Sequence, residues 1–240
     1  RGLGDVYKRQ LLYMVLAVIP CVFASCSDDD DVVVSPSASG TMTDDLGNEY
    51  GWVRIGNLEW TTSNARNGAS MLEYEFDNEQ DWGNALAFGG QLEYAETEYM
   101  PRYGNLLTYD DALASVPEGW RLPTDEDWKN LERTLGSADV DSFGMRGSAG
   151  QALMTEGSGP QIGLLLGGAM IGVRNNGWID KNISHEKEYG YYWTSTTAPD
   201  AGLKKTAYFR KVVFGNERVG RDATDRTNLL SVRWCRDAQR

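Results

Sequence analysis

The chain has 240 residues, of which 23 are Lys or Arg and 35 are Asp or Glu, so its net charge is -12 at pH 7. A chain this acidic repels nucleic acid and anionic lipid surfaces, and we expect neither as a partner. Hydrophobic residues make up 41% of the chain and eight residues are Trp, which excludes general disorder and indicates one domain with a substantial core.

The order of basic, apolar and small residues at the start predicts an export signal. Its parts are Lys8 with Arg9, the apolar run 11–23, and Ala24 with Ser25. Because the apolar run is too short for a stable bilayer-spanning helix, we expect residues 1–25 to be a cleaved signal peptide. An uncleaved anchor helix is the alternative. Residues 1–10 lack a starting Met, and we interpret them as a truncated or spurious beginning.

Cys26 follows the predicted cleavage point, and in this place it resembles the acylated cysteine of the bacterial lipoprotein box. Two or three acyl chains would hold the protein stably on a membrane. The next residues are Ser27, Asp28, Asp29, Asp30 and Asp31. This run is either an acidic spacer or an export signal, because it resembles the signal of Bacteroidetes surface lipoproteins. We expect a surface-exposed outer-membrane lipoprotein whose residues 26–44 are a lipidated acidic tether.

The folded region is predicted to begin near Asp45. Strand-forming residues on both sides of Gly56-Asn57 predict a hairpin with strands 50–55 and 58–61. Residues 67–103 are acidic and aromatic without a sustained helical period, which indicates an irregular excursion or an additional hairpin.

Two short helices are predicted next. Thr108 starts the first, and Pro117 ends it because proline cannot continue the helical ladder. Thr124 caps the second, with Asp127 in the reciprocal capping-box position, and Gly136 stops it. The face to be buried carries Trp128, Leu131 and Leu135.

Short apolar segments alternate with glycine turns from Gly150 onward. They predict strands within 163–168, 190–196, 207–214 and 230–237. In the last segment Leu230, Val232 and Trp234 alternate, which predicts a strand with one buried face. Two helices in an antiparallel, loop-rich sheet give a single α+β domain over residues 45–240.

Five sequence blocks follow one another in order. They are WVRIGNLEW at 52–60, YGNLLTY at 103–109, PEGWRLPTDEDW at 117–128, GYYWTST at 190–196 and SVRWCRD at 231–237. Over residues 46–238 they resemble the Fibrobacter succinogenes major paralogous domain. The Arg-Leu-Pro-Thr block, shared with formylglycine-generating enzymes, implies a C-type-lectin-like or sulfatase-modifying-factor-like fold. The family has no established activity.

Cysteine and histidine are too few for several kinds of site. Members of the family carry a cysteine where this chain has Val116, expected to pair with the one in the final strand. Since lipidation consumes Cys26, Cys235 has no partner in the mature chain, and we expect it to be a buried core residue. A cysteine metal cluster and the two-thiolate copper site of formylglycine-generating enzymes are excluded. His185 lies beside Glu186 in a charged loop, where we expect it to be solvated.

Sugar binding is the chemistry that we then consider. Ala198-Pro199-Asp200 matches a fragment of the calcium-binding loop of C-type lectins, and no ligand spacing supports a structural calcium around Asn175, Asn176 and Asp180. Without a metal, the C–H faces of sugars stack on exposed aromatic rings. Four loop aromatics could either bind a ligand in this way or pack: Trp82, Tyr94, Tyr99 and Trp178. We expect the tryptophans of the family blocks to pack: Trp60, Trp120, Trp128, Trp193 and Trp234.

We therefore expect a binding or adhesion module for a glycan or a surface protein, attached to the membrane through Cys26. One alternative is a carbohydrate-active enzyme of unknown reaction, because a glycosidase needs only two well-placed carboxylates. No spacing singles out such a pair, so we assign no catalytic residue, no metal and no cofactor. The other alternative is a structural component of an outer-membrane complex.

Overall fold

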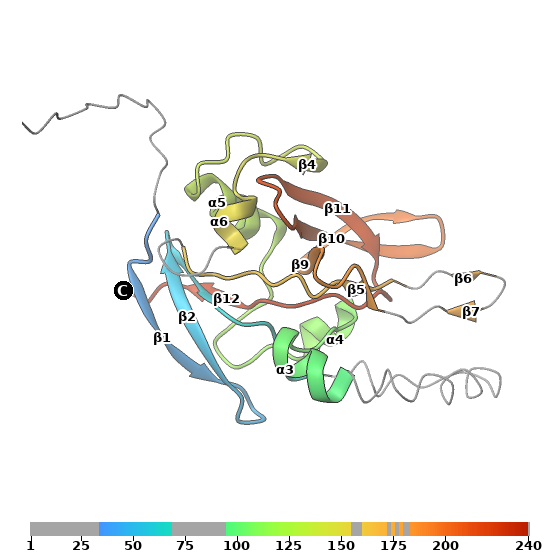
Figure 1. Ribbon diagram of the computed structural model, residues 1–240, viewed down its shortest axis with the longest axis horizontal. Coiled ribbons are helices and arrows are strands. Elements are labelled where there is room, and N and C mark those ends of the chain that lie inside the picture. Colours follow the sequence, from blue (N-terminus) through green and yellow to red (C-terminus); the bar gives the residue numbers. More distant parts are fainter. Residues whose placement is uncertain are drawn as a thin grey trace, which may run out of the picture. The chain divides into compact units, whose positions relative to one another are not determined.

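Two four-stranded antiparallel sheets and several short helices build the domain in the computed structural model, which describes residues 34–68, 95–154, 160–171, 174–175, 178–179 and 183–239 (Figure 1). The first sheet has the order β1-β2-β3-β12, with bounds Ala38–Thr43, Glu49–Ile55, Leu58–Thr61 and Cys235–Asp237. The second has the order β4-β11-β10-β9, with bounds Gly144–Arg146, Val219–Asp225, Lys204–Val213 and Tyr189–Ala201. Two smaller ladders pair β5 (Ala169–Met170) with β8 (Ile183–Ser184) and β6 (Arg174–Asn175) with β7 (Trp178–Ile179).

The helices are short and lie between the strands along the chain. A π-helical turn, η1, leads into α3, and α4, α5 and α6 follow: Ala95–Tyr99, Met100–Tyr103, Tyr109–Ala114, Asp125–Thr134 and Gly150–Met154. Within the described ranges, no helix is long and apolar enough to cross a membrane. The prediction of an α+β domain with antiparallel sheets is confirmed, although η1, α3 and α6 were not among the predicted helices.

Helix α5 begins and ends as its sequence predicts. The hydroxyl of Thr124 accepts a hydrogen bond from the N–H of Asp127 (3.0 Å), and the Asp127 carboxylate accepts one from the N–H of Thr124 (2.7 Å). At the other end the N–H of Gly136 donates to the carbonyl of Arg133, and Gly136 has a φ of 89°, which favours glycine. Thr108 caps α4 in the same way. Both predicted helices are confirmed.

The core lies on both sides of β3 and β12. Trp128 of α5 packs between the two sheets, with ring centroids 5.0 Å from Trp60 of β3 and 6.1 Å from Tyr192 of β9. A second cluster gathers Tyr50, Trp120, Trp193 and Trp234. The predicted packing role of the five block tryptophans is thus confirmed, since all of them are buried.

The folded region starts earlier than predicted. Residues 38–43, which we assigned to the tether, form β1 and pair with β2 from Ala38↔Arg54 to Thr43↔Glu49. Met42 is the one large apolar residue of β1, so the composition of this strand carries little strand signal. Tertiary packing favours the strand instead. Gly40 lies under the Trp52 indole, and a Cβ at this position would be only 2.5 Å from that ring.

The prediction of a strand over 230–237 with one buried face is wrong as well. The regular strand covers only Cys235–Asp237, and the residues before it are buried on both faces rather than one. Arg233 is fully buried, and its guanidinium donates to the Asn64 side chain and to three carbonyls, those of Thr61, Ile162 and Gly163. Thr61 ends β3, whereas Ile162 and Gly163 lie outside any strand, and burial lowers the pKa of Arg233. The predicted strand within 163–168 is absent: the carbonyls of Leu165 and Gly167 accept from tyrosine hydroxyls, and only Gly168 forms an isolated bridge, with Gly190.

Candidate functional site

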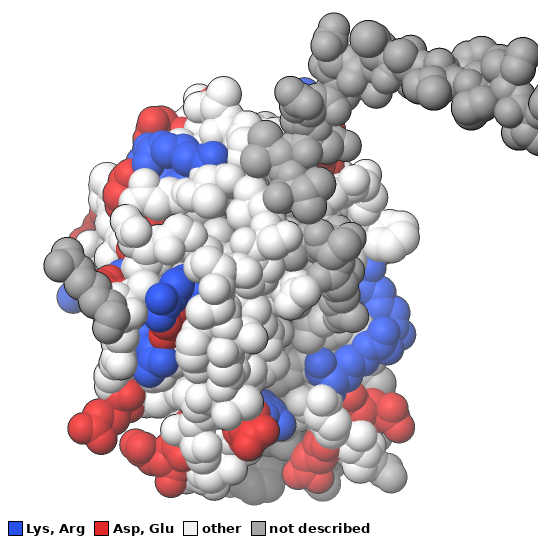
Figure 2. Space-filling view, turned by 90° about the vertical axis from the view of Figure 1, so that its left-hand side faces the viewer, with Lys and Arg blue, Asp and Glu red and all other residues white. Residues whose placement is uncertain are grey.

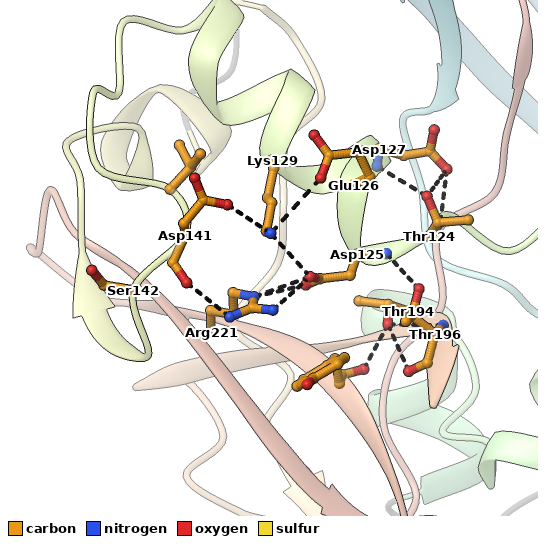
Figure 3. Close-up of polar contacts among 12 residues, drawn as sticks. Thr124, Asp125, Glu126, Asp127, Lys129, Asp141, Ser142, Thr194, Thr196 and Arg221 are labelled. Carbon is orange, nitrogen blue, oxygen red and sulfur yellow. Dashed lines mark hydrogen bonds and ion pairs between the residues drawn. The ribbon is translucent and has the colours of Figure 1, made fainter. Parts of the chain in front are cut away.

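Buried charges connect α5 to the second sheet (Figure 3). The Asp125 carboxylate accepts hydrogen bonds from Arg210 of β10 (2.7 Å) and from Nε and Nη2 of Arg221 of β11 (2.9 and 2.7 Å). Two turns further, Glu132 pairs with Arg210 (2.7 Å) and with Arg146 of β4 (2.8 Å). Two carboxylates on one helix therefore hold three arginines from three strands.

The Asp125 and Asp127 carboxylates hold their charge at neutral pH. Burial would raise the pKa of Asp125, but the hydrogen bonds from Arg221 and Arg210 outweigh it and lower the pKa to about 2. For Asp127 likewise, burial is outweighed by the hydrogen bonds of Arg121 and Thr124, which lower its pKa. A carboxylate that is ionised and fully engaged has no proton to give to a substrate at neutral pH, so these groups are structural.

An aromatic pair, exposed Phe143 and half-buried Tyr208, contacts this charge network. The Arg221 guanidinium carbon is 4.5 Å from the ring centroid of Phe143 and 4.7 Å from that of Tyr208. The two rings have centroids 5.9 Å apart and planes tilted by 37°. Phe143 is 60% exposed, whereas Arg221 is buried and also donates to the carbonyl of Asp141 (2.9 Å). We call Phe143, Tyr208 and Arg221 the Phe143 platform.

The platform is rigid because its base is fixed. Arg221 makes hydrogen bonds through Nε, Nη1 and Nη2, which set both the position and the plane of its guanidinium. Lys129 of α5 joins the same group, with its ammonium 2.7 Å from an Asp141 oxygen and 3.5 Å from an Asp125 oxygen (Figure 3). The loop before β4, which carries Phe143, is thereby held against the helix.

The sequence-predicted ligand residues fall in different places. Tyr99 is fully buried, and its hydroxyl donates to the carbonyl of Gly167 (2.7 Å), so it packs and offers no face to a ligand. Trp178 lies in β7, whose backbone alone is described. The other assigned residues lie outside the described ranges: Cys26, Ser27, Asp28, Asp29, Asp30, Asp31, Trp82 and Tyr94.

Cys235 is buried and His185 is exposed, as the sequence predicts. Cys235 is fully buried and free, and burial raises the pKa of its thiol, which makes it a core residue. His185 is exposed, although its ring also lies 4.7 Å from that of Tyr189. Among the described residues, no group of three His, Cys, Asp or Glu could hold a metal ion.

Sequence reasoning missed the Phe143 platform. Its three residues are far apart in the chain, and neither Tyr208 nor Arg221 stands out within its strand. One signal was present: Phe143 is a large apolar residue that follows the polar residues Asp139, Asp141 and Ser142 in the loop before β4, where Val140 is the buried apolar residue.

Charges of both signs mix on the surface. On the face shown in Figure 2, basic side chains lie beside acidic ones, with uncharged surface between them. That face therefore displays no continuous basic stripe of the kind that binds a nucleic-acid backbone.

Comparison with known proteins gives one match. The family model described as the Fibrobacter succinogenes major domain matches residues 53–236. Neither the curated proteins nor the solved structures gave a match. The matched range starts within β2 and ends within β12, so it covers the second sheet, every described helix and most of the first sheet, but not β1. The chain therefore belongs to the Fibrobacter succinogenes major domain family.

Proposed function

We propose that the protein is a surface-exposed outer-membrane lipoprotein whose domain binds a glycan. Acylation of Cys26 would attach it to the membrane, and the run from Ser27 to Asp31 would direct it to the outer leaflet. The antiparallel sheets with few short helices are compatible with a C-type-lectin-like or sulfatase-modifying-factor-like fold, which we propose on the Arg-Leu-Pro-Thr block.

The observation that carries the glycan proposal is the exposed ring of Phe143 on its fixed base. Sugar rings present apolar C–H faces that stack on such rings, and exposed hydroxyls and carbonyls nearby can take the sugar hydroxyls. Because Arg221 holds both rings in place before binding, little side-chain entropy is lost when a ligand stacks on them.

A glycan array with the purified full-length protein in detergent tests the proposal, run once with calcium and once with a chelator. We expect binding to at least one polysaccharide class that survives the chelator, since the Phe143 platform contains no calcium ligand set. Binding that disappears with the chelator would instead indicate a metal-dependent site. Silence under both conditions would refute glycan binding and direct the search to a surface-protein partner by copurification.

A further inference from the structure

We infer that the Phe143 platform takes the apolar face of a neutral pyranose and rejects uronic acids and other anionic sugars. This inference rests on the proposed glycan binding and names its site and its ligand class. It depends on three features: the exposed ring, the ion pairs made by Arg221, Lys129 and Arg133, and the two carboxylates of the Phe143 loop.

The open ring favours an uncharged ligand. The Arg221 guanidinium lies over both rings, so its positive charge already occupies one side of the Phe143–Tyr208 pair. The exposed side of Phe143 is left for a ligand. A second cation stacked there would be repelled by Arg221, whereas the C–H groups of a neutral sugar would not.

The cations next to the platform are already paired. Arg221 is bound to Asp125, and Lys129 is bound to Asp141 at 2.7 Å. The third, Arg133, is bound to Glu126 at 2.6 Å. A sugar carboxylate arriving at Phe143 would have to displace one of these carboxylates before it gained a counter-ion.

Two carboxylates belong to the loop that carries Phe143. Asp139 and Asp141 are exposed and lie in the same loop as Phe143, four and two residues before it. The hydrogen bond from Lys129 lowers the pKa of Asp141, so its negative charge persists through the neutral range. These charges would repel an anionic sugar on Phe143, and salt would weaken the repulsion, because the screening length is about 8 Å at physiological ionic strength. Charge complementarity therefore selects a neutral ligand.

The test compares neutral hexose polymers with the same polymers oxidised at C6 to uronates. The probes are soluble β-1,4-glucan, β-1,4-mannan and β-1,4-galactan hexasaccharides, together with the neutral class found on the array, and affinity is measured by calorimetry with the full-length protein. We expect the neutral form to bind at least about tenfold more tightly than its uronate at low salt. The gap should narrow as salt is added, because screening weakens the repulsion.

Two variants locate the site. Phe143→Ala should weaken neutral binding by about fivefold to tenfold, the scale of losing one aromatic stacking contact. Phe214→Ala removes a phenylalanine that is 77% exposed in the β10–β11 turn, and we expect it to bind like the parent protein. Equal affinity of the parent protein and Phe143→Ala would show that the glycan binds somewhere other than the Phe143 platform. That result would overturn the assigned site but not glycan binding itself.

Two further variants test the charge argument. Asp141→Asn removes a negative charge from the Phe143 loop and takes from Lys129 its partner at 2.7 Å, so binding of the uronate should rise and the preference should shrink. Asp45→Asn makes the same charge change in the β1–β2 turn of the other sheet and should leave the preference unchanged. Equal affinity of the parent for neutral and oxidised forms would overturn the neutral-sugar inference. Failure of every probe and every array glycan would overturn the proposed function itself.

Discussion

Asp125 is the residue on which the second sheet and α5 depend most. Its side chain is 9% exposed and binds two arginines from neighbouring strands. Neither arginine can lose its proton in the folded protein, so both need the carboxylate charge. The same residue fixes the base of the Phe143 platform, which makes it a positioning residue for the proposed ligand.

Replacement of Asp125 by Asn should destabilise the fold strongly. The amide keeps the shape but leaves Arg210 and Arg221 as poorly compensated buried cations, and we expect a loss of about 3 kcal/mol or more in the free energy of unfolding. Urea unfolding measures it. Glu126→Gln, one position away with a side chain that is 58% exposed, should change the free energy by less than about 1 kcal/mol. Similar losses of unfolding free energy in the two variants would show that Asp125 stabilises the fold no more than an exposed carboxylate does.

Asp125 also sets an acid limit on stability. Its pKa is about 2 in the folded state, below the ordinary value of 3.8, so its ionised form is stabilised by folding. The contribution, roughly 2 kcal/mol, is complete above about pH 4 and is lost as the pH falls from there through about 2. An NMR titration of the Asp125 carboxyl carbon should have its midpoint near pH 2. A midpoint near the ordinary value would show that the arginine pairs are weak in solution.

Single residues were predictable where their roles are local. Burial of Cys235 followed from its strand context, and the block tryptophans pack as expected. Tyr99 could have served either role, and only its place under Gly167 assigns it to packing. Phe143 had a local signal in its polar loop, but its partners Tyr208 and Arg221 could not be paired with it from the sequence.

At the scale of elements, α5 depends on its cap. The capping box joins Thr124 and Asp127 through bonds in both directions, and Arg121 pairs with the same carboxylate. The cap therefore fixes the first turn, from which Asp125 projects toward the strands. A loosened cap would disturb the charge network as well as the helix.

We expect Thr124→Ala to lower the free energy of unfolding by about 1 kcal/mol, because the N–H of Asp127 loses its acceptor. Thr134→Ala is the matched control at the other end of α5, where the hydroxyl donates to the carbonyl of Asn130 (2.8 Å) and caps no N–H. Thermal melting followed by circular dichroism compares them. If the control loses as much stability as Thr124→Ala, the cap has no special role.

Elements with complete local signals were predicted well, and those without them were not. The hairpin of β2 and β3 and both capped helices carry turn and cap residues within a few positions. β11 and α6 carry none, and β1 depends on pairing with β2. Segment 230–234 has the alternation of a strand, but the burial of Arg233 overrides it.

For the molecule as a whole, β1 decides where the folded domain begins. It covers the outer edge of β2, and the Trp52 indole lies across Gly40 and donates to the Thr41 carbonyl (3.2 Å). A domain without β1 would expose both the indole and the hydrogen-bonding groups of β2. Exposed strand edges of this kind promote association between chains.

A chain that starts at Asp45 should therefore be less stable than one that starts at Val34. We expect a loss of at least roughly 2 kcal/mol, the scale of exposing one large apolar side chain, together with concentration-dependent association. Urea unfolding and light scattering on the two chains measure both effects. Equal stability and equal monomer content would show that β1 is dispensable and that the predicted boundary at residue 45 was adequate.

By itself the sequence determined the family, the α+β class and the capped helix α5, because each rests on residues that lie close together in the chain. Tertiary structure alone decided that β1 belongs to the domain, that Arg233 is buried, and that Phe143 meets Tyr208 over Arg221. Arg221 and Asp125 are separated by 96 positions. Such contacts depend on how the whole chain packs, since the energy that fixes them comes from burial and paired charge rather than from local backbone preference.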